Sequence, residues 1–286
     1  MSARPSRPET TAIACFAGWN DAGGAATDAL EYLADQWDAT LIASIDPDDY
    51  YDFQVMRPRF EMNENRRELV WPRTRLYEAQ TLDGKRVLLV DGIEPSMRWM
   101  DYTAELLELL LTQGVTRLLL VGALLADVPH TRDITVTVTS SSAALRQEYA
   151  IERSDYTGST GIVGVLEHTA NEDFHLPAFS LWAAVPHYVA TPPSPKVVMA
   201  IVTEVGKLLN QTIDLGDLPD DATRWVEMVD EIASDDEDMA EYVRQLENAK
   251  DTVDSPEASG EAIAREFQRY LLDNLGNEDL PDGPPS

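Results

Sequence analysis

Cysteine is nearly absent from this sequence, because Cys15 is the single one among 286 residues. A lone cysteine excludes an intramolecular disulfide and suits a reducing compartment. Long apolar runs are also missing. The first apolar run, residues 12–17, is too short for the core of a signal peptide or for a membrane span. We therefore expect a soluble, cytoplasmic protein that does not associate with a membrane.

Basic residues are scarce as well. The chain has 22 Lys and Arg against 51 Asp and Glu, which gives a net charge of −29. Nucleic acids and anionic membranes repel such a protein, so neither is an expected partner. From Asp214 onward there are 22 acidic and 5 basic residues, a net charge of −17, and the preceding residues carry the other −12. This change in composition predicts a boundary near residues 215–221.

Apolar runs alternate with helical patterns in the first part of the chain. We predict strands at residues 13–17, 39–45, 68–72, 86–92, 115–124, 133–140 and 177–186, and helices at 22–36, 99–113, 161–170 and 195–211. Nearly continuous apolar strands separated by helices are typical of a parallel sheet that is covered on both faces. We therefore expect residues 12–213 to form an α/β core, a three-layer α/β/α sandwich with a mostly parallel sheet.

The acidic C-terminal part has helical spacing without strands. Apolar residues recur with that spacing over residues 222–250 and again over 261–275. We expect an acidic helical hairpin over residues 214–275, with residues 251–260 as its joint. The acidic run 235–238 is interpreted as a solvated link rather than a calcium loop. Residues 1–11 and 276–286 are expected to be disordered.

Polar and glycine-rich loops follow several of the predicted strands. Ligands of open α/β sheets bind beyond the carboxyl ends of the strands, so we expect these loops to line one crevice. The candidate crevice residues are Gly18, Trp19, Asn20, Asp21, Gly23, Asp91, Glu94, His130, Arg132, Thr160 and His187.

The first loop, "GWNDAGG" (residues 18–24), is either a ligand cradle at a helix N-terminus or a tight turn. Free N–H groups and the paired glycines would let a ligand approach the backbone. However, the loop offers no Lys, Arg, Ser or Thr for an anion, and Asp21 would repel a phosphate. Asp21 is also a good N-cap, which favours the structural alternative. Trp19, a large aromatic in a turn, needs either a pocket or a partner.

Six segments, in this order, carry a family resemblance: "GWNDAGGAATDALEYL", "IDPDDYYDFQVMRP", "DGIEP", "VGALLADVPHTR", "GIVGVLEH" and "WAAVPHY". Together they resemble the actinobacterial branch of the proteasome assembly chaperone 2 family, over roughly residues 12–209. The resemblance implies a fold similar to the purine nucleoside phosphorylases and no settled activity. Eukaryotic relatives are heterodimeric chaperones for the proteasome α-ring. Some archaeal relatives engage the proteasome through a C-terminal hydrophobic–Tyr–any tail, which the ending Pro284-Pro285-Ser286 does not match.

Histidine chemistry is the main catalytic possibility. Of the four histidines, His130 and His187 each follow a proline in a loop after a strand, and Arg132 stands near the first as an anion partner. Such a histidine can act as an acid or base near neutral pH. Alternatively, His130 and Arg132 pair with acidic neighbours and hold the loops in shape, and we favour that interpretation.

Metal and cofactor sites have weaker support. His168, Glu172 and His175 would share a helical face only if the helix continued through "NEDFHLP", which looks like a helix end. Cys15 lies inside a strand and is interpreted as a buried apolar residue. We predict no metal and no cofactor.

The segment at residues 46–58 is dense in acidic and aromatic residues. Tyr50, Tyr51, Phe53 and Arg57 either form a protein interface or cover the edge of the sheet, and both alternatives stay open. For the whole chain we expect a non-enzymatic protein-binding or assembly module that forms homo-oligomers and has an unidentified protein partner. The alternative is an enzyme similar to nucleoside phosphorylases or hydrolases that uses the crevice.

Overall fold

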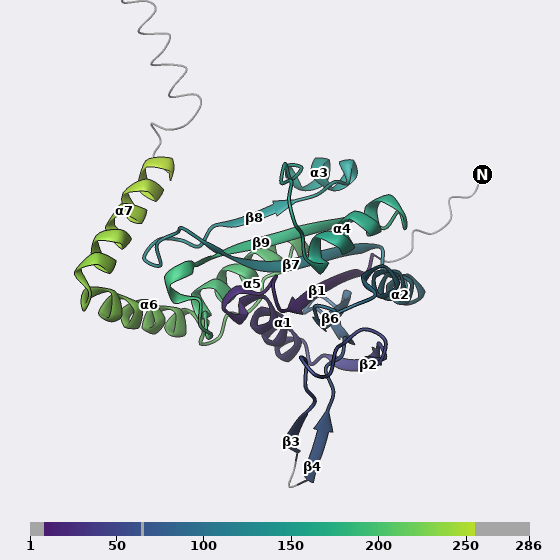
Figure 1. Cartoon of the computed structure of the whole chain (residues 1–286). Coiled ribbons are helices and arrows are strands. Elements are labelled where there is room, and N and C mark those ends of the chain that lie inside the picture. The colour runs from purple at the N-terminus through teal and green to yellow at the C-terminus, as the bar shows by residue number, and fades with distance from the viewer. Residues whose placement is uncertain (1–8, 64–65, 255–286) are drawn as a thin grey trace, which may run out of the picture. The chain divides into compact units, whose positions relative to one another are not determined.

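The computed structural model describes residues 9–63 and 66–254 (Figure 1). The chain divides into two compact units after Glu231, and each is described by itself below. The strands are β1 (Thr11–Ala17), β2 (Thr40–Ser44), β3 (Arg59–Asn63), β4 (Arg66–Val70), β5 (Arg75–Gln80), β6 (Arg86–Ile93), β7 (Arg117–Ala126), β8 (Val136–Thr139) and β9 (Ala178–Pro186). The α-helices are α1 (Ala25–Gln36), α2 (Trp99–Thr112), α3 (Ala143–Tyr149), α4 (Ile162–Glu172), α5 (Pro195–Leu209), α6 (Leu218–Ser234) and α7 (Glu237–Asp254).

The first unit is built on a seven-stranded sheet with the order β2-β5-β6-β1-β7-β9-β8. The four central strands, β6, β1, β7 and β9, are parallel. The outer strands β2, β5 and β8 each pair in the antiparallel sense. The prediction of a mostly parallel sheet is therefore wrong in its outer part, and the sheet is mixed. The sequence pattern did not reveal β5, which joins β6 through a tight turn at Gly84, where φ is +79°.

Helices cover both faces of this sheet, as predicted for an α/β protein. Along β1, Ile13 and Cys15 belong to one apolar cluster, while the alternating residues Ala14 and Phe16 belong to the other. Helices α1 and α5 complete the first cluster, and α2 and α4 complete the second. The central strands are apolar at nearly every position because both of their faces are buried.

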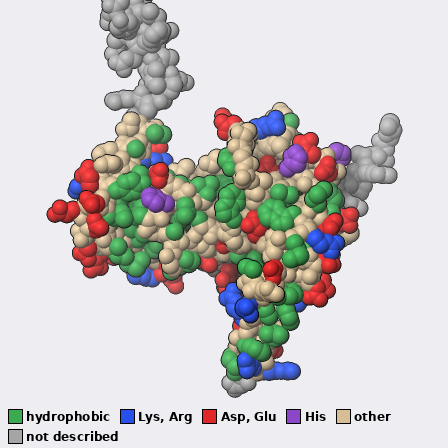
Figure 2. Space-filling model, viewed as in Figure 1, with side chains coloured by type: hydrophobic (Ala, Val, Ile, Leu, Met, Phe, Trp, Pro, Cys, Tyr) green, Lys and Arg blue, Asp and Glu red, His purple; other side chains and the backbone are tan. Residues whose placement is uncertain are grey.

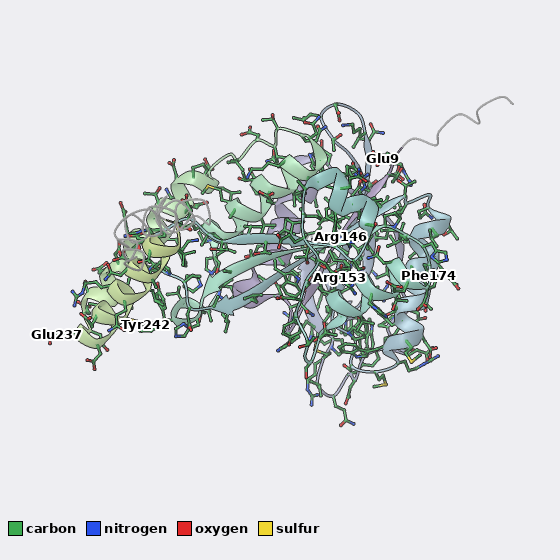
Figure 3. The ribbon with its side chains drawn as sticks, turned by 90° about the horizontal axis from the view of Figure 1, so that it is seen from above. Glu9, Arg146, Arg153, Phe174, Glu237 and Tyr242 are labelled. Carbon is green, nitrogen blue, oxygen red and sulfur yellow. The ribbon has the colours of Figure 1, made fainter. Side chains whose placement is uncertain are left out.

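Polar side chains secure the ends of the sheet. Arg117, at the start of β7, forms an ion pair with Glu9 at 2.6 Å. Arg146 of α3 donates hydrogen bonds to the carbonyls of Ser140 (3.1 Å) and Ser141 (2.6 Å), which closes the turn after β8; Glu9 and Arg146 are both labelled in Figure 3. Neither α3 nor these contacts were expected from the sequence.

A two-stranded hairpin, β3–β4, stands apart from the main sheet. It pairs in the antiparallel sense, with Phe60 opposite Leu69 and Met62 opposite Arg67. Nearly every side chain on it is exposed, and Figure 1 shows it extending away from the seven-stranded sheet. The sequence suggested one short strand at residues 68–72 but gave no sign of this hairpin.

The second unit contains the end of α6 and all of α7. The helical spacing over residues 222–250 corresponds to two helices, because α6 ends at Ser234 and α7 begins at Glu237. Asp236 lies between them, and its Oδ1 accepts the N–H groups of Asp238 (2.9 Å) and Met239 (3.2 Å). This is the hydrogen bonding of an N-cap, so the acidic run starts a helix.

Several predictions concern residues outside the described part of the chain. They include the second arm of the helical hairpin at 261–275, most of its joint, the tail 276–286, and residues 1–8 of the N-terminus. Thr11, at the end of the expected disordered segment, already begins β1. Among the described residues, none of the helices is long and apolar enough to cross a membrane.

Candidate functional site

The loop after β1 is a tight turn that starts α1. The N–H of Asp21 donates to the carbonyl of Gly18 at 3.1 Å, and Gly18 has a φ of +126°, which favours glycine. The carboxylate of Asp21 accepts the N–H of Ala26 (2.8 Å) and the hydroxyl of Thr27 (2.5 Å). Asp21 therefore caps the first turn of α1 with its side chain, although the helix begins at Ala25 and Gly24, not Asp21, holds the N-cap position.

The space beside Gly23, later in the same loop, is occupied by a side chain of the protein itself. A Cβ added at Gly23 would lie 2.5 Å from Oγ of Ser194, and its φ is +63°. Ser194 is fully buried at the start of α5. The space that a ligand would need beside Gly23 is therefore occupied by another loop of the same protein.

Glu94, which follows β6, joins three segments. Its Oε1 accepts a hydrogen bond from Nδ2 of Asn20 and another from the N–H of Ile162, both at 2.9 Å. Ile162 is the first residue of α4, so the carboxylate also neutralises the positive end of that helix. A Cβ at Gly161 would lie 2.7 Å from Oε1, so the segments are packed against each other. Thr160 precedes this glycine and is exposed.

Burial perturbs two carboxyl groups near this region. It raises the pKa of Asp21, and hydrogen bonds from Thr27 and Ala26 oppose the shift. It also raises the pKa of Asp91, against the effect of Arg75, whose guanidinium lies 3.4 Å away. Perturbed pKa values are common at catalytic sites. Here, however, both oxygens of Asp21 are engaged in capping α1.

His130 lies in a different cluster, beyond the end of β7. Its side chain is 0% exposed, its Nδ1 is 2.8 Å from the hydroxyl of Tyr188, and its Nε2 is 3.0 Å from Oδ1 of Asp230. The ring also meets Trp225 edge to face, with centroids 6.3 Å apart. His130 thus packs α6 against the end of the sheet. The partner residues Tyr188 and Asp230 were not identified from the sequence.

Lys196, which the sequence did not single out, and the candidate His187 have neighbours within the fold. Lys196 donates to the carbonyls of His130 (2.6 Å) and Arg132 (2.8 Å), which fixes this loop. His187 is exposed, and its Nδ1 lies 3.3 Å from Oδ1 of Asp127. Both histidines therefore have acidic neighbours, and for His130 this agrees with the structural alternative.

We call the loops beyond the carboxyl ends of the parallel strands the rim of the sheet. Large apolar side chains are exposed at this rim. Trp19 is 65% exposed, although it stands between Gly18 and the buried Asn20. The carbonyl of Asn20 accepts the N–H of Ala123 at 2.8 Å, and the next residues on β7, Leu124 and Leu125, are exposed too. Tyr156, exposed, lies in the loop that leads to Gly161. Successive side chains of a strand point to opposite faces of the sheet, so Leu125 faces away from Leu124. We call Trp19, Leu124 and Tyr156 the rim surface.

The segment at residues 46–58 buries its two tyrosines, while six of its other residues are exposed. Tyr50 and Tyr51 are core side chains, and the hydroxyl of Tyr51 donates to the carbonyl of Ile93 at 2.9 Å. Phe53 packs edge to face on Trp71, with centroids 4.8 Å apart. Only Arg57 of the four candidate interface residues is exposed. The two tyrosines thus cover the sheet, which is the second of the two alternatives.

Helix α4 ends at Glu172, and His175 has a φ of +51°, so His168, Glu172 and His175 do not share one helical face. Within residues 9–63 and 66–254, no group of three or more His, Cys, Asp or Glu side chains is placed to hold a metal ion.

Comparisons with known proteins agree with the resemblance. The PAC2 family model matches residues 15–233. A PAC2 family protein from Streptomyces avermitilis is 42% identical to this chain, with a TM-score of 0.76. The match covers 82% of this chain and 100% of the Streptomyces chain. A proteasome-assembly chaperone homologue from Mycobacterium tuberculosis is 40% identical, with a TM-score of 0.74, covering 82% and 99%.

A more distant structure shares the fold alone. It is an archaeal homolog of proteasome-assembly chaperone from Pyrococcus furiosus, with 16% identity, a TM-score of 0.58, and coverage of 87% of this chain and 98% of its own. No curated protein matches this sequence. The family model covers well over half of the chain, and it confirms the family that the six segments suggested: the protein belongs to the PAC2 family.

Proposed function

We propose that this protein is a non-catalytic protein-binding module that takes part in the assembly of a protein complex, with the rim surface as its contact face. The observation that carries the proposal is Trp19, which is 65% exposed on a turn that the protein itself holds rigid. Exposed tryptophan on a rigid support is typical of the centre of a protein interface, because it buries a large area at little cost in conformational entropy.

The polar groups beside Trp19 support a binding role over a catalytic one. Asp21 caps α1, and Glu94 bonds to Asn20 and to the start of α4. A catalytic acid or base has to reach the substrate with its polar atoms. The oxygens of Asp21 and Oε1 of Glu94 are bonded within the protein, while Trp19 faces outward.

The named relatives suggest which complex is involved. One relative, 40% identical, is described as a proteasome-assembly chaperone homologue. By analogy, we infer that the partner is a proteasome subunit, and that the protein works as a homo-oligomer in the cytoplasm. We also propose that the fold of this protein is similar to that of the purine nucleoside phosphorylases, as the family resemblance implies.

The test is co-purification of the full chain with proteasome subunits from its own organism. Wild-type protein is expected to co-purify, and Trp19→Ala is expected to weaken binding about tenfold or more. Leu82→Ala is the matched control, because Leu82 is 78% exposed in the turn between β5 and β6. Equal binding by Trp19→Ala and wild type would contradict the proposal.

Melting temperatures measured with added ligands distinguish the binding module from the alternative, an enzyme similar to nucleoside phosphorylases. A nucleoside or inorganic phosphate that bound the crevice would raise the melting temperature. The proposal predicts no shift at millimolar ligand. A shift that Trp19→Ala or Glu94→Gln abolishes would establish a ligand site there and overturn the non-catalytic assignment.

A further inference from the structure

The β3–β4 hairpin and its flanks are the basic part of an acidic protein. Six of the 22 Lys and Arg residues fall within residues 57–75, together with three Glu, so this segment has a net charge of +3 while the chain carries −29. Figure 2 shows blue basic and green apolar side chains together on the projecting hairpin. Exposed apolar residues there include Phe60 and Met62.

The arginines near the base of the hairpin are not used to hold the fold. Within residues 9–63 and 66–254, Arg57, Arg59 and Arg73 form no ion pair with a carboxylate. Arg75 is the contrasting case, because its guanidinium lies 3.4 Å from Oδ2 of Asp91. The chain has more than twice as many acidic as basic residues. Unpaired arginines gathered in one place therefore create a local positive potential that attracts an external anion.

These arginines line a groove. Its volume is about 670 Å³, and its walls include Arg57, Arg59, Arg73, Val55, Trp71 and Ile93. Phe53 packs against Trp71 at 4.8 Å and fixes one apolar wall. The volume falls within the range of ligand sites in proteins, ~300–1,000 Å³. Cationic and apolar walls therefore face the same space.

We propose that this groove binds an acidic polypeptide segment of a protein partner, one with closely spaced carboxylates and apolar side chains between them. The guanidinium fork matches a carboxylate with two parallel hydrogen bonds, and Trp71 and Val55 offer an apolar surface beside it. Glu61 also lines the groove and repels any anion, so an apolar side chain of the peptide has to lie beside it. A nucleic acid fits less well, because it carries a charge at every nucleotide and has no apolar side chain to place there. This site does not include the rim surface, so it stands or falls independently of the proposed function.

The test uses fluorescence anisotropy with the full chain. The probe is a fluorescein-labelled peptide of alternating Glu and Leu, and the same peptide with Gln in place of Glu is the neutral control. We expect the Glu peptide to bind, and to bind more weakly at high salt because screening shortens the range of the attraction. Arg59→Glu is expected to reduce the affinity about tenfold, as is Arg57→Glu, which lies outside the paired strands.

Arg66→Glu is the matched control, since Arg66 is exposed on the same hairpin but does not line the groove. Arg66→Glu is expected to change the affinity by about twofold or less, because it alters only the long-range electrostatic attraction between the hairpin and the peptide. Circular dichroism and melting temperature confirm that each variant folds. The proposal is overturned if the Gln peptide binds equally well, if Arg59→Glu and Arg66→Glu lose the same affinity, or if oligothymidylate binds more tightly than the Glu peptide.

Discussion

At the rim of the sheet, Glu94 accepts hydrogen bonds from Asn20 and Ile162, whereas at the β3–β4 hairpin Arg59 is exposed and makes no ion pair within the described part of the chain. The sequence predicted a candidate crevice at the rim, whereas at the hairpin it marked only Arg57, just before β3, as a candidate interface residue. The two regions differ in what the charges touch. The charged groups of the rim hold loops and helix ends together, whereas Arg59 of the hairpin and its neighbours Arg57 and Arg73 face a groove.

The contacts of a charged residue show whether it contributes to stability or to binding, which its residue type alone does not show. A charged group that is bonded within the fold contributes to stability, and its replacement lowers the free energy of unfolding. A charged group that is exposed and unpaired contributes little to stability, and its replacement changes binding. The variants below are ordered by the expected size of their effect on stability.

The largest effect is expected for Gly161→Ala at the rim. A Cβ there would lie 2.7 Å from Oε1 of Glu94 and closer still to the side chain of Asn20, so the segments would be pushed apart. We expect the free energy of unfolding, measured with urea, to fall by about 3 kcal/mol. Gly158→Ala, in the same loop, is the control, because its nearest neighbour is the hydroxyl end of the exposed Tyr156. Similar values for the two variants would contradict the packing described here.

A somewhat smaller loss is expected for Glu94→Ala. It leaves the amide of Asn20 and the N–H of Ile162 without their acceptor, which costs about 2 kcal/mol. Glu108→Ala, on the exposed face of α2, removes a carboxylate of the same type and should change stability by less than about 0.5 kcal/mol. Urea unfolding of both proteins measures the difference. If Glu94→Ala is as stable as the control, the carboxylate is not a structural link.

A pH-dependent effect is expected for Asp21. Burial raises its pKa in the folded protein, so the folded state binds a proton more tightly than the unfolded state does. The stabilisation is therefore greatest below the ordinary Asp pKa of about 3.9, and it is lost as the pH rises through the higher folded value. Relative to Asp21→Asn, wild-type stability should decline over that interval in urea unfolding at successive pH values. A difference that increases over that interval would contradict the sign.

The smallest effect is expected on the hairpin. Arg67 lies over the ring of Phe60, with the guanidinium carbon 3.6 Å from the ring centroid. At an exposed site this cation–π contact is worth about 0.5–1 kcal/mol to the hairpin. Arg67→Gln should therefore leave the urea midpoint of the first unit nearly unchanged. A loss as large as that of Glu94→Ala would show that the hairpin is part of the folding core.

The sequence predicted the parts of this protein that depend on local patterns. Strands such as β6 and β7 were recognised because they are apolar at successive positions, and the cap at Asp21 was recognised from its place before a helix. Strands β5 and β3 were missed because arginines and exposed residues interrupt their alternation. The antiparallel pairing of β5 with β2 and β6, together with that of β8 with β9, makes the seven-stranded sheet mixed.

The contacts of the candidate site depend on residues far apart in the chain. His130 meets Tyr188 and Asp230 across 58 and 100 residues, and Glu94 meets Asn20 across 74. No local spacing indicates such pairs. The sequence could therefore name His130 and Glu94 as polar residues in strand-end loops, but not that each one is engaged by the fold.

Hydrogen–deuterium exchange of the full chain, with and without proteasome subunits, tests the central claim most directly. The account predicts slower exchange at the amides around Trp19, Leu124 and Tyr156 when the subunits are added, and no change there with nucleosides or inorganic phosphate. Protection of residues 18–24 by a nucleoside or phosphate, with none from the protein subunits, would contradict it.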